Sequence, residues 1–389
     1  MTKRAIGVSS GLIAVLLAAG TTQAAEAASH AARTAAAPPT AYVANFQVNG
    51  GNVIPIDTAT NTAGRKIPTA AGPSAIAITP DGKTAYVADS DSASVTPINT
   101  ATNGPGPAIP VGTIPATIAI TPDGATAYVA NMASDTVTPI NTATNTAGSP
   151  IRVMLDPKAI AITPDGATAY VVSSAFQEGG MVTPVNTATN TAGRAIKVGN
   201  GASAIAITPD GKTAYVANSD STSVTPINTA TNTAGRPIRV GSAPSVVAIT
   251  PDGRTAYVAN RGSDTVTPIS TATNTAGPAI KVGNFPDAIV ITPDGRTAYV
   301  ASGPLGSSGV VTPIVTATNR ARKPIKIMGA PSPGAIAITP SGNQVYVAAV
   351  IQSATGSTAG WVTPISVATS TAEKPVKAGS YPQGIAITP

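Results

Sequence analysis

The chain has 389 residues, of which 42% are hydrophobic and 10% charged, and its formal net charge is +6. It contains no cysteine, which excludes disulfides, a thiol nucleophile and thiolate metal sites. Its single histidine, His30, precedes the repeated part of the sequence, so histidine-based catalysis and haem ligation lack their usual residue there. We therefore expect no cofactor and no metal, and we assign no catalytic residue.

The N-terminal segment has the pattern of a secretory signal peptide. Lys3 and Arg4 precede an apolar run over residues 6–19 that is too short to favour a membrane span. Small residues offer cleavage after Ala24 or Ala27. We expect a signal peptide over residues 1–27, a disordered leader over 28–40, and a secreted, extracellular protein with no membrane insertion after cleavage. A retained membrane anchor is the alternative.

From residue 41 onward the sequence repeats. A Thr-Pro-(Asp/Ser)-Gly element recurs every 42 to 47 residues, starting at Thr79, Thr121, Thr163, Thr208, Thr250, Thr292 and Thr339. In each copy, Gly-containing and Asn/Thr-rich turns separate short strand-like runs such as 75–79, 85–88, 95–98 and 196–198. A period of this length with four strands per copy is typical of the blades of a β-propeller.

Counting the strands predicts how the ring closes. Each of eight copies has a tyrosine in its second strand: Tyr42, Tyr86, Tyr128, Tyr170, Tyr215, Tyr257, Tyr299 and Tyr346. The first copy lacks its first strand, and residues 384–389 supply a spare one. We predict an all-β, eight-bladed propeller over 41–389, with four-stranded antiparallel blades and the C-terminal strand paired in the N-terminal blade. A seven-bladed ring is the alternative. Pro97 and its equivalents predict interrupted pairing between third and fourth strands.

The run Ala-Tyr-Val-Ala-Asn, followed by Val-Thr-Pro-Ile-Asn-Thr-Ala-Thr-Asn, resembles the YVTN-repeat β-propellers of secreted and surface-layer proteins, which are related to lactonase-like propellers. The resemblance extends over 41–389, with Val-Ala-Asn in place of Val-Thr-Asn. It implies the propeller fold and an extracellular setting. It implies no single activity, because propellers support many functions.

The differences between copies gather at one rim, formed by the second-to-third loops and the links between blades. Aromatic residues and methionine concentrate there, as at recognition surfaces. The predicted partner-binding residues are Phe46, Phe176, Phe285, Trp361, Tyr381 and Met154. Residues that enter the first strands are predicted to line the channel mouth, and its candidate ligand-binding residues are Lys158, Asp287 and Gln383. The alternatives are that the first set covers the core and that the second is solvated surface.

The distribution of acidic and basic residues favours some classes of partner over others. Acidic residues gather on the variable rim, which disfavours nucleic acid there. Lys and Arg recur around the outermost strand, where we expect them to protect strand edges from aggregation; binding of nucleic acid is the alternative. Asp89 and Asp91 are too few ligands for a calcium loop.

Three functions remain open. The preferred hypothesis is a monomeric, non-catalytic scaffold that binds an extracellular protein or cell-surface glycan. A lactonase-like hydrolase using Asp287 and Lys158 and a structural surface-layer component are the alternatives. A redox propeller with quinone or haem fits less well.

Overall fold

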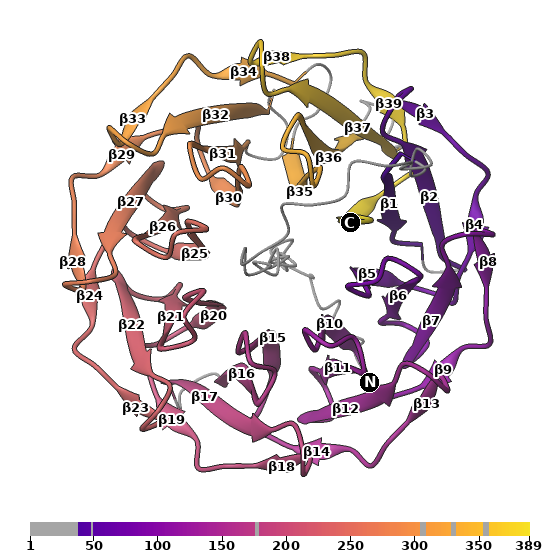
Figure 1. Cartoon of the computed structure of the whole chain (residues 1–389), viewed down its shortest axis with the longest axis horizontal. Coiled ribbons are helices and arrows are strands. Elements are labelled where there is room, and N and C mark those ends of the chain that lie inside the picture. The colour runs from indigo at the N-terminus through magenta and orange to yellow at the C-terminus, as the bar shows by residue number, and fades with distance from the viewer. Residues whose placement is uncertain (1–37, 48–49, 176–178, 304–308, 328–331, 353–357) are drawn as a thin grey trace, which may run out of the picture.

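The computed structural model describes residues 38–47, 50–175, 179–303, 309–327, 332–352 and 358–389. Within these ranges every regular element is a β-strand, and no helix is long and apolar enough to cross a bilayer. The strands form eight separate sheets arranged radially around a ring (Figure 1). The predicted eight-bladed propeller is confirmed, and the seven-bladed alternative is wrong.

The blades are numbered here from the N-terminal one. Blade 1 contains β1 (Thr40–Asn45), β2 (Asn52–Asp57), β3 (Thr62–Ala63), β4 (Ile67–Pro68) and β40 (Pro382–Ile387). Blade 2 contains β5 (Pro73–Ile78), β6 (Thr84–Asp89), β7 (Ser94–Asn99), β8 (Gly104–Pro105) and β9 (Ile109–Pro110). Blade 3 contains β10 (Pro115–Ile120), β11 (Thr126–Asn131), β12 (Thr136–Asn141), β13 (Thr146–Ala147) and β14 (Ile151–Arg152). Blade 4 contains β15 (Pro157–Ile162), β16 (Thr168–Ala175), β17 (Gly179–Asn186), β18 (Thr191–Ala192) and β19 (Ile196–Lys197).

The second half of the ring repeats the pattern. Blade 5 contains β20 (Ala202–Ile207), β21 (Thr213–Asn218), β22 (Ser223–Asn228), β23 (Thr233–Ala234) and β24 (Ile238–Arg239). Blade 6 contains β25 (Pro244–Ile249), β26 (Thr255–Asn260), β27 (Thr265–Ser270), β28 (Thr275–Ala276) and β29 (Ile280–Lys281). Blade 7 contains β30 (Pro286–Ile291), β31 (Thr297–Ser302), β32 (Val310–Val315), β33 (Arg320–Ala321) and β34 (Ile325–Lys326). Blade 8 contains β35 (Ser332–Ile338), β36 (Gln344–Gln352), β37 (Thr358–Ser366), β38 (Thr371–Ala372) and β39 (Val376–Lys377).

The outermost strand of each blade is split into two pieces. In blade 2, β8 pairs with the end of β7 and β9 pairs with its start. Between them lies Pro97, which has no N–H to donate but whose carbonyl accepts from Gly106 N–H at 2.7 Å. The interruption predicted from the proline is therefore confirmed. The first piece of the outer strand was not predicted, because it is only two residues long and has no buried side chain to mark it.

The two ends of the chain close the ring. β40 pairs antiparallel with β1, with Ile385 opposite Val43. Beyond the strand, Thr388 N–H donates to the Thr40 carbonyl at 3.0 Å, and Thr40 N–H donates to Thr388 Oγ1 at 2.9 Å. The predicted completion of the N-terminal blade by the C-terminal strand is confirmed.

The hydrophobic core lies between blades. One typical cluster joins Tyr170 and Val172 of blade 4 to Ile205, Ile207 and Val216 of blade 5. In every blade the second-strand tyrosine is fully buried. Each blade therefore buries its faces only against its two neighbours, so the closing strand completes the last interface as well as the last sheet.

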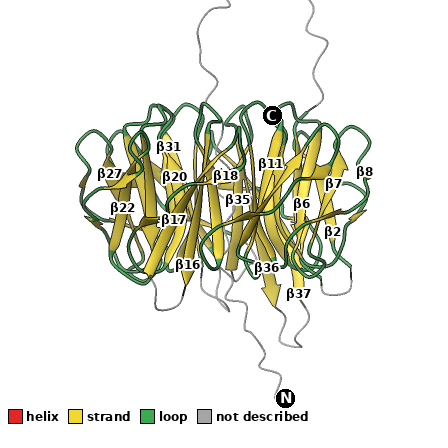
Figure 2. Ribbon diagram, turned by 90° about the horizontal axis from the view of Figure 1, so that it is seen from below, coloured by secondary structure: helices red, strands yellow, loops and turns green. Residues whose placement is uncertain are grey.

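Antiparallel pairing places the turns on two opposite rims. The Thr-Pro-(Asp/Ser)-Gly turns and the Asn/Thr-rich turns form one rim, together with the C-terminus (Figure 2). The second-to-third loops and the links between blades form the opposite rim, toward which the lengthened strands β16, β36 and β37 extend. We call this second surface the variable rim.

Candidate functional site

The links between blades approach the variable rim in a repeated backbone conformation. In six of the seven blades whose entering residue is described, the residue before the first strand has positive φ, and Tyr381 is the exception: Gly72 (77°), Ile114 (52°), Asp156 (61°), Gly201 (69°), Ala243 (50°) and Phe285 (52°). Glycine adopts this left-handed region at no steric cost, whereas isoleucine and phenylalanine are strained in it. Strained positions of this kind concentrate at functional sites.

The same links carry the exposed apolar side chains. Among the described residues, the large hydrophobic side chains that are exposed are Ile114 (39%), Leu155 (46%) and Phe285 (42%). All three lie in links that enter a first strand at this rim. Ile114 and Phe285 therefore combine a strained backbone conformation with an exposed apolar side chain. Neither the strain nor the exposure is explained by packing in the core.

Phe285 belongs to a charged cluster that joins blades 6 and 7. Arg261, in the loop after β26, places Nε 2.9 Å from Asp287 Oδ1, and its guanidinium lies 5.7 Å from the centre of the Phe285 ring. Asp264 Oδ1 accepts the Phe285 N–H at 2.9 Å. Asp287 is only 8% exposed. Burial raises the pKa of Asp287 to about 6 although Arg261 opposes the shift.

The other two predicted channel-mouth residues have different surroundings. Lys158 Nζ lies 3.0 Å from Asp156 Oδ2, and the Asp156 N–H donates to Asp135 Oδ1 at 2.9 Å. Gln383 is half-buried in β40. Lys158 thus forms its ion pair with Asp156, and Asp287 forms its ion pair with Arg261. Lys158 lies in β15 of blade 4 and Asp287 in β30 of blade 7, so the structure does not bring these two residues together.

Lys158, Asp287 and Gln383 share one backbone feature. Each occupies a bulge between the first and second strands of its blade. At the equivalent bulges, the Ser74 hydroxyl donates to the Pro115 carbonyl at 2.8 Å and that of Ser245 to the Pro286 carbonyl at 3.2 Å, both in the next blade. The bulges therefore aim side chains at the junction between neighbouring blades.

The predicted aromatic residues fall into separate groups. The Phe46 and Tyr381 rings meet edge to face, with centroids 6.5 Å apart, and the Phe46 N–H donates to the Tyr381 carbonyl at 2.8 Å. Trp361 and Met154 are half-buried. Phe176 lies outside the described residues.

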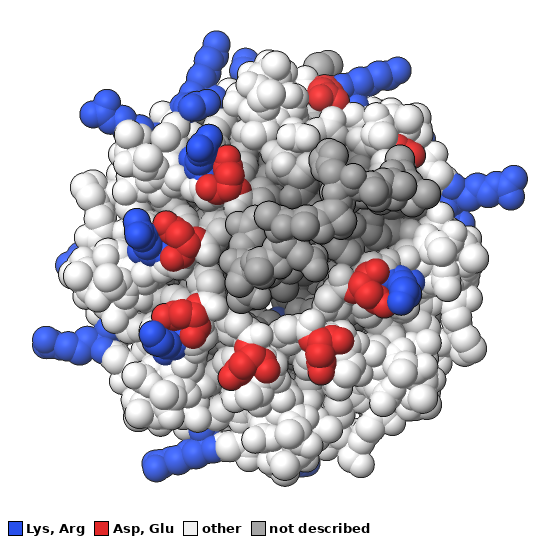
Figure 3. Space-filling view, viewed as in Figure 1, with Lys and Arg blue, Asp and Glu red and all other residues white. Residues whose placement is uncertain are grey.

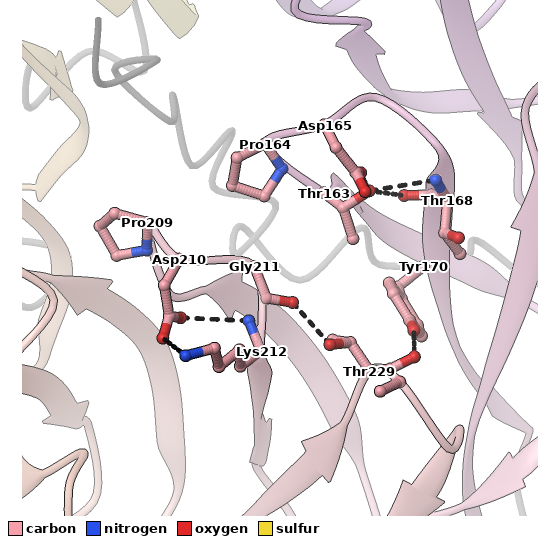
Figure 4. A pocket seen from close by; sticks show the side chains of 11 residues that line it. Thr163, Pro164, Asp165, Thr168, Tyr170, Pro209, Asp210, Gly211, Lys212 and Thr229 are labelled. Carbon is pink, nitrogen blue, oxygen red and sulfur yellow. Dashed lines mark hydrogen bonds and ion pairs between the residues drawn. The ribbon is translucent and has the colours of Figure 1, made fainter. Parts of the chain in front are cut away.

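The opposite rim holds a hollow of about 470 Å³ between blades 4 and 5, seen in Figure 4. Its polar groups are engaged in the fold: the Thr163 hydroxyl donates to Asp165, Asp210 pairs with Lys212, and the Tyr170 hydroxyl donates to the Thr229 carbonyl. Hydrogen bonds from the Thr163 hydroxyl and, to a lesser extent, the Ala167 N–H lower the pKa of Asp165, and the Thr208 hydroxyl is the main cause of the lowered pKa of Asp210. A carboxylate with a lowered pKa is a weaker base, so Asp165 and Asp210 are poorly suited to act as general bases near neutral pH.

No group of three or more His, Cys, Asp or Glu side chains in the described part of the chain could hold a metal ion. Asp89 is fully buried, and its Oδ2 accepts the Thr96 hydroxyl at 2.6 Å. Burial raises the pKa of Asp89 to about 7. Its equivalents in other blades include Asn131 and Asn218, which donate to Thr138 and Thr225. Asp89 therefore occupies a structural position that holds asparagine in four of the eight blades.

Ile114, Leu155 and Arg261 were not predicted from the sequence. Comparing the links could have revealed Ile114, since Gly72 and Gly201 show that this position favours glycine. The pairing of Arg261 with Asp287 had no comparable signal, because the two residues belong to different blades.

Solved structures with this architecture differ strongly in sequence. They include dihydro-heme d1 dehydrogenase NirN in complex with DHE, at 13% identity and a TM-score of 0.74 over 89% of this chain and 74% of that one. AztD from Citrobacter koseri, in its apo form, has 14% identity and a TM-score of 0.64, covering 90% and 97%. Kuenenia stuttgartiensis hydrazine synthase has 24% identity and a TM-score of 0.60, covering 76% and 96%. These likenesses concern the fold alone.

No curated protein matches the sequence. Residues 40–152 and 157–276, together more than half of the chain, match the family described as "Lactonase, 7-bladed beta-propeller". The chain therefore belongs to this lactonase propeller family, and it differs from the family's description in having eight blades.

Proposed function

We propose that this chain is a secreted, non-catalytic propeller that binds an extracellular partner through its variable rim. The observation that carries the proposal is the exposure of Ile114, Leu155 and Phe285 on links at a single rim. Two of them have positive φ, so the rim holds apolar side chains where the backbone favours glycine. The YVTN-repeat resemblance agrees with a secreted setting.

A protein suits these side chains better than a glycan does. Ile114 and Leu155 offer apolar area and no hydrogen bonds for sugar hydroxyls, whereas aliphatic and aromatic anchors with an adjoining arginine are typical of protein interfaces. Arg261, held between Asp287 and the Phe285 ring, supplies such an arginine. A cell-surface glycan is the alternative partner.

Affinity capture tests this proposal. The purified chain is immobilised and exposed to proteins of the culture medium and, separately, to cell-wall polysaccharide. We expect a protein that is retained by the native chain and lost with Ile114→Gly/Phe285→Gly. Ala243→Gly is the matched control, because it relieves a positive φ of 50° without removing a large apolar side chain. If the variant retains the same protein as the native chain, the proposal is contradicted. If only polysaccharide is retained, and the variant loses it, the partner is a glycan.

Family membership favours one second candidate, lactone hydrolysis at the channel mouth. The pKa of Asp287, about 6, is near the value that suits a general base, but its side chain is 12% exposed and its carboxylate is bound by Arg261. We expect no lactone turnover by the purified chain. Turnover that Asp287→Asn abolishes would replace the binding proposal with hydrolysis.

A further inference from the structure

The positive charge of the described chain is divided between two locations. Six cations form ion pairs on the rims: Lys83, Lys158, Lys212, Arg254, Arg261 and Arg296. The remaining described cations lie along the outer edge of the blades, and we call them the equatorial belt: Arg65, Lys66, Arg152, Arg194, Lys197, Arg236, Arg239, Lys281, Arg320, Arg322, Lys323, Lys326, Lys374 and Lys377. All belt residues are exposed, and none has an ion-pair partner among the described residues.

The belt is built by the fold. In blades 3 to 8, the second piece of the outer strand is a buried aliphatic residue followed by a cation, as in Ile196–Lys197 and Ile325–Lys326. Because neighbouring strand residues point to opposite faces, burial of the first side chain directs the second outward. The long cationic side chains accordingly project from the circumference, while cation–carboxylate pairs lie nearer the centre (Figure 3).

The belt is interrupted at blade 2. This gap helps to separate two roles of the cations, protection of strand edges and binding of a ligand. Blade 2 has no cation on its outer strand and has Pro105, Pro107 and Pro110 instead. Proline and lysine both protect exposed strand edges. Blade 2 therefore indicates that the fold can protect an edge without charge, whereas every other blade carries belt cations: one in blades 3 and 6, two in blades 1, 4, 5 and 8, and four in blade 7.

We propose that the equatorial belt binds a flexible, linear polyanion. A chain of regularly spaced anionic groups can follow a convex belt and neutralise cations of several blades at once, releasing its counterions. A planar anionic membrane or a stiff duplex would contact only a short arc. A hollow of about 380 Å³, lined by Arg65, Lys66 and the turn residues Thr102 and Asn103, lies where the belt ends between blades 1 and 2. This surface is separate from the variable rim, so the proposal does not depend on the proposed function.

The test measures binding of the full folded chain to polygalacturonate, to linear inorganic polyphosphate, to neutral dextran, to duplex DNA and to anionic phospholipid vesicles. We expect binding to one or both flexible polyanions at physiological ionic strength. The first two probes distinguish carboxylate from phosphate chemistry. Arg322→Gln/Lys323→Gln/Lys326→Gln is expected to weaken binding about tenfold or more and to lower the salt-dependence slope by about 2.

The matched control is Lys83→Gln/Lys212→Gln/Arg254→Gln, which removes the same charge from a rim. It should change affinity by less than about threefold, because these cations already face carboxylates. Conversely, Pro110→Lys should strengthen binding by filling the gap at the position of Lys197 and Lys326. Equal loss in the two triple variants, no binding of either flexible polyanion, or tighter binding of duplex or vesicles would overturn the proposal.

Discussion

The hydroxyl of Tyr346 donates a 2.6 Å hydrogen bond to Oδ1 of Asn61, which joins the last blade to the first. Equivalent bonds link six other second-strand tyrosines to an asparagine of the next blade, as from Tyr42 to Asn103 and from Tyr215 to Asn274, whereas blade 8 has Ser370 at this position. The accepting asparagines have positive φ, as at Asn61 (52°). The tyrosine and the Asn/Thr-rich turn, two constant parts of the repeat, therefore serve one purpose: they fasten neighbouring blades.

Tyr346→Phe should destabilise the closed ring by about 1–3 kcal/mol, since it leaves Asn61 Oδ1 without this donor. Tyr215→Phe removes the same bond away from the closure and is the control. Thermal unfolding should show a lower stability for both variants. Amide hydrogen exchange in β1 and β40 should become faster only in Tyr346→Phe. Unchanged exchange in these two strands would mean that the bond does not secure the closure.

Deleting residues 382–389 should abolish cooperative unfolding of the monomer. Without β40 the edge of β1 is unpaired and the interface between blades 8 and 1 loses Ile385 and Ile387. We expect self-association by light scattering, reversed by a synthetic peptide of residues 380–389. A truncated chain that remains monomeric and unfolds as the full chain does would refute closure by this strand.

Asp89→Asn should stabilise the protein at neutral and alkaline pH. The folded-state pKa of Asp89 is about 7, above its ordinary value of 3.8, so the folded state retains a proton that the unfolded state loses. Its contribution to stability is complete below about pH 4 and is lost as pH rises toward 7. Asparagine cannot ionise, and its gain should reach about 2–4 kcal/mol above pH 7 and shrink toward pH 4. Denaturant titrations between about pH 4 and pH 8 measure the difference in unfolding free energy between Asp89→Asn and the native chain. A difference that does not change with pH would contradict a raised pKa of Asp89.

Arg261→Gln should destabilise the junction of blades 6 and 7 by about 1–3 kcal/mol, less than for a fully buried pair because Arg261 is partly exposed. The loss should grow as pH rises through about 6 and beyond, where the unpaired Asp287 ionises. Arg261→Gln/Asp287→Asn removes the buried charge and should recover most of the stability. If the double variant is no more stable than the single one, the carboxylate is not the cause.

The sequence repeat was sufficient to predict the blades, their number and their closure, because each copy carries its own strands and turns. The position of Pro97 also predicted the break in the outer strand. Local pattern could not predict which side chains meet across blades, and so it paired Asp287 with Lys158 in the hydrolase hypothesis, whereas the structure pairs it with Arg261. It also missed Ile114 and Leu155, since an aliphatic residue in a link is expected to be buried.

The most direct test of rim recognition is the dissociation constant for the captured partner, measured together with thermal stability. Glycine at residues 114 and 285 relieves about 1–2 kcal/mol of left-handed strain per residue, which offsets its greater freedom in the unfolded chain. Ile114→Gly/Phe285→Gly should therefore weaken binding about tenfold or more while its midpoint temperature stays the same or rises, and Ala243→Gly should bind normally. Undiminished affinity in the double variant, or a loss that only accompanies unfolding, would contradict recognition through the variable rim.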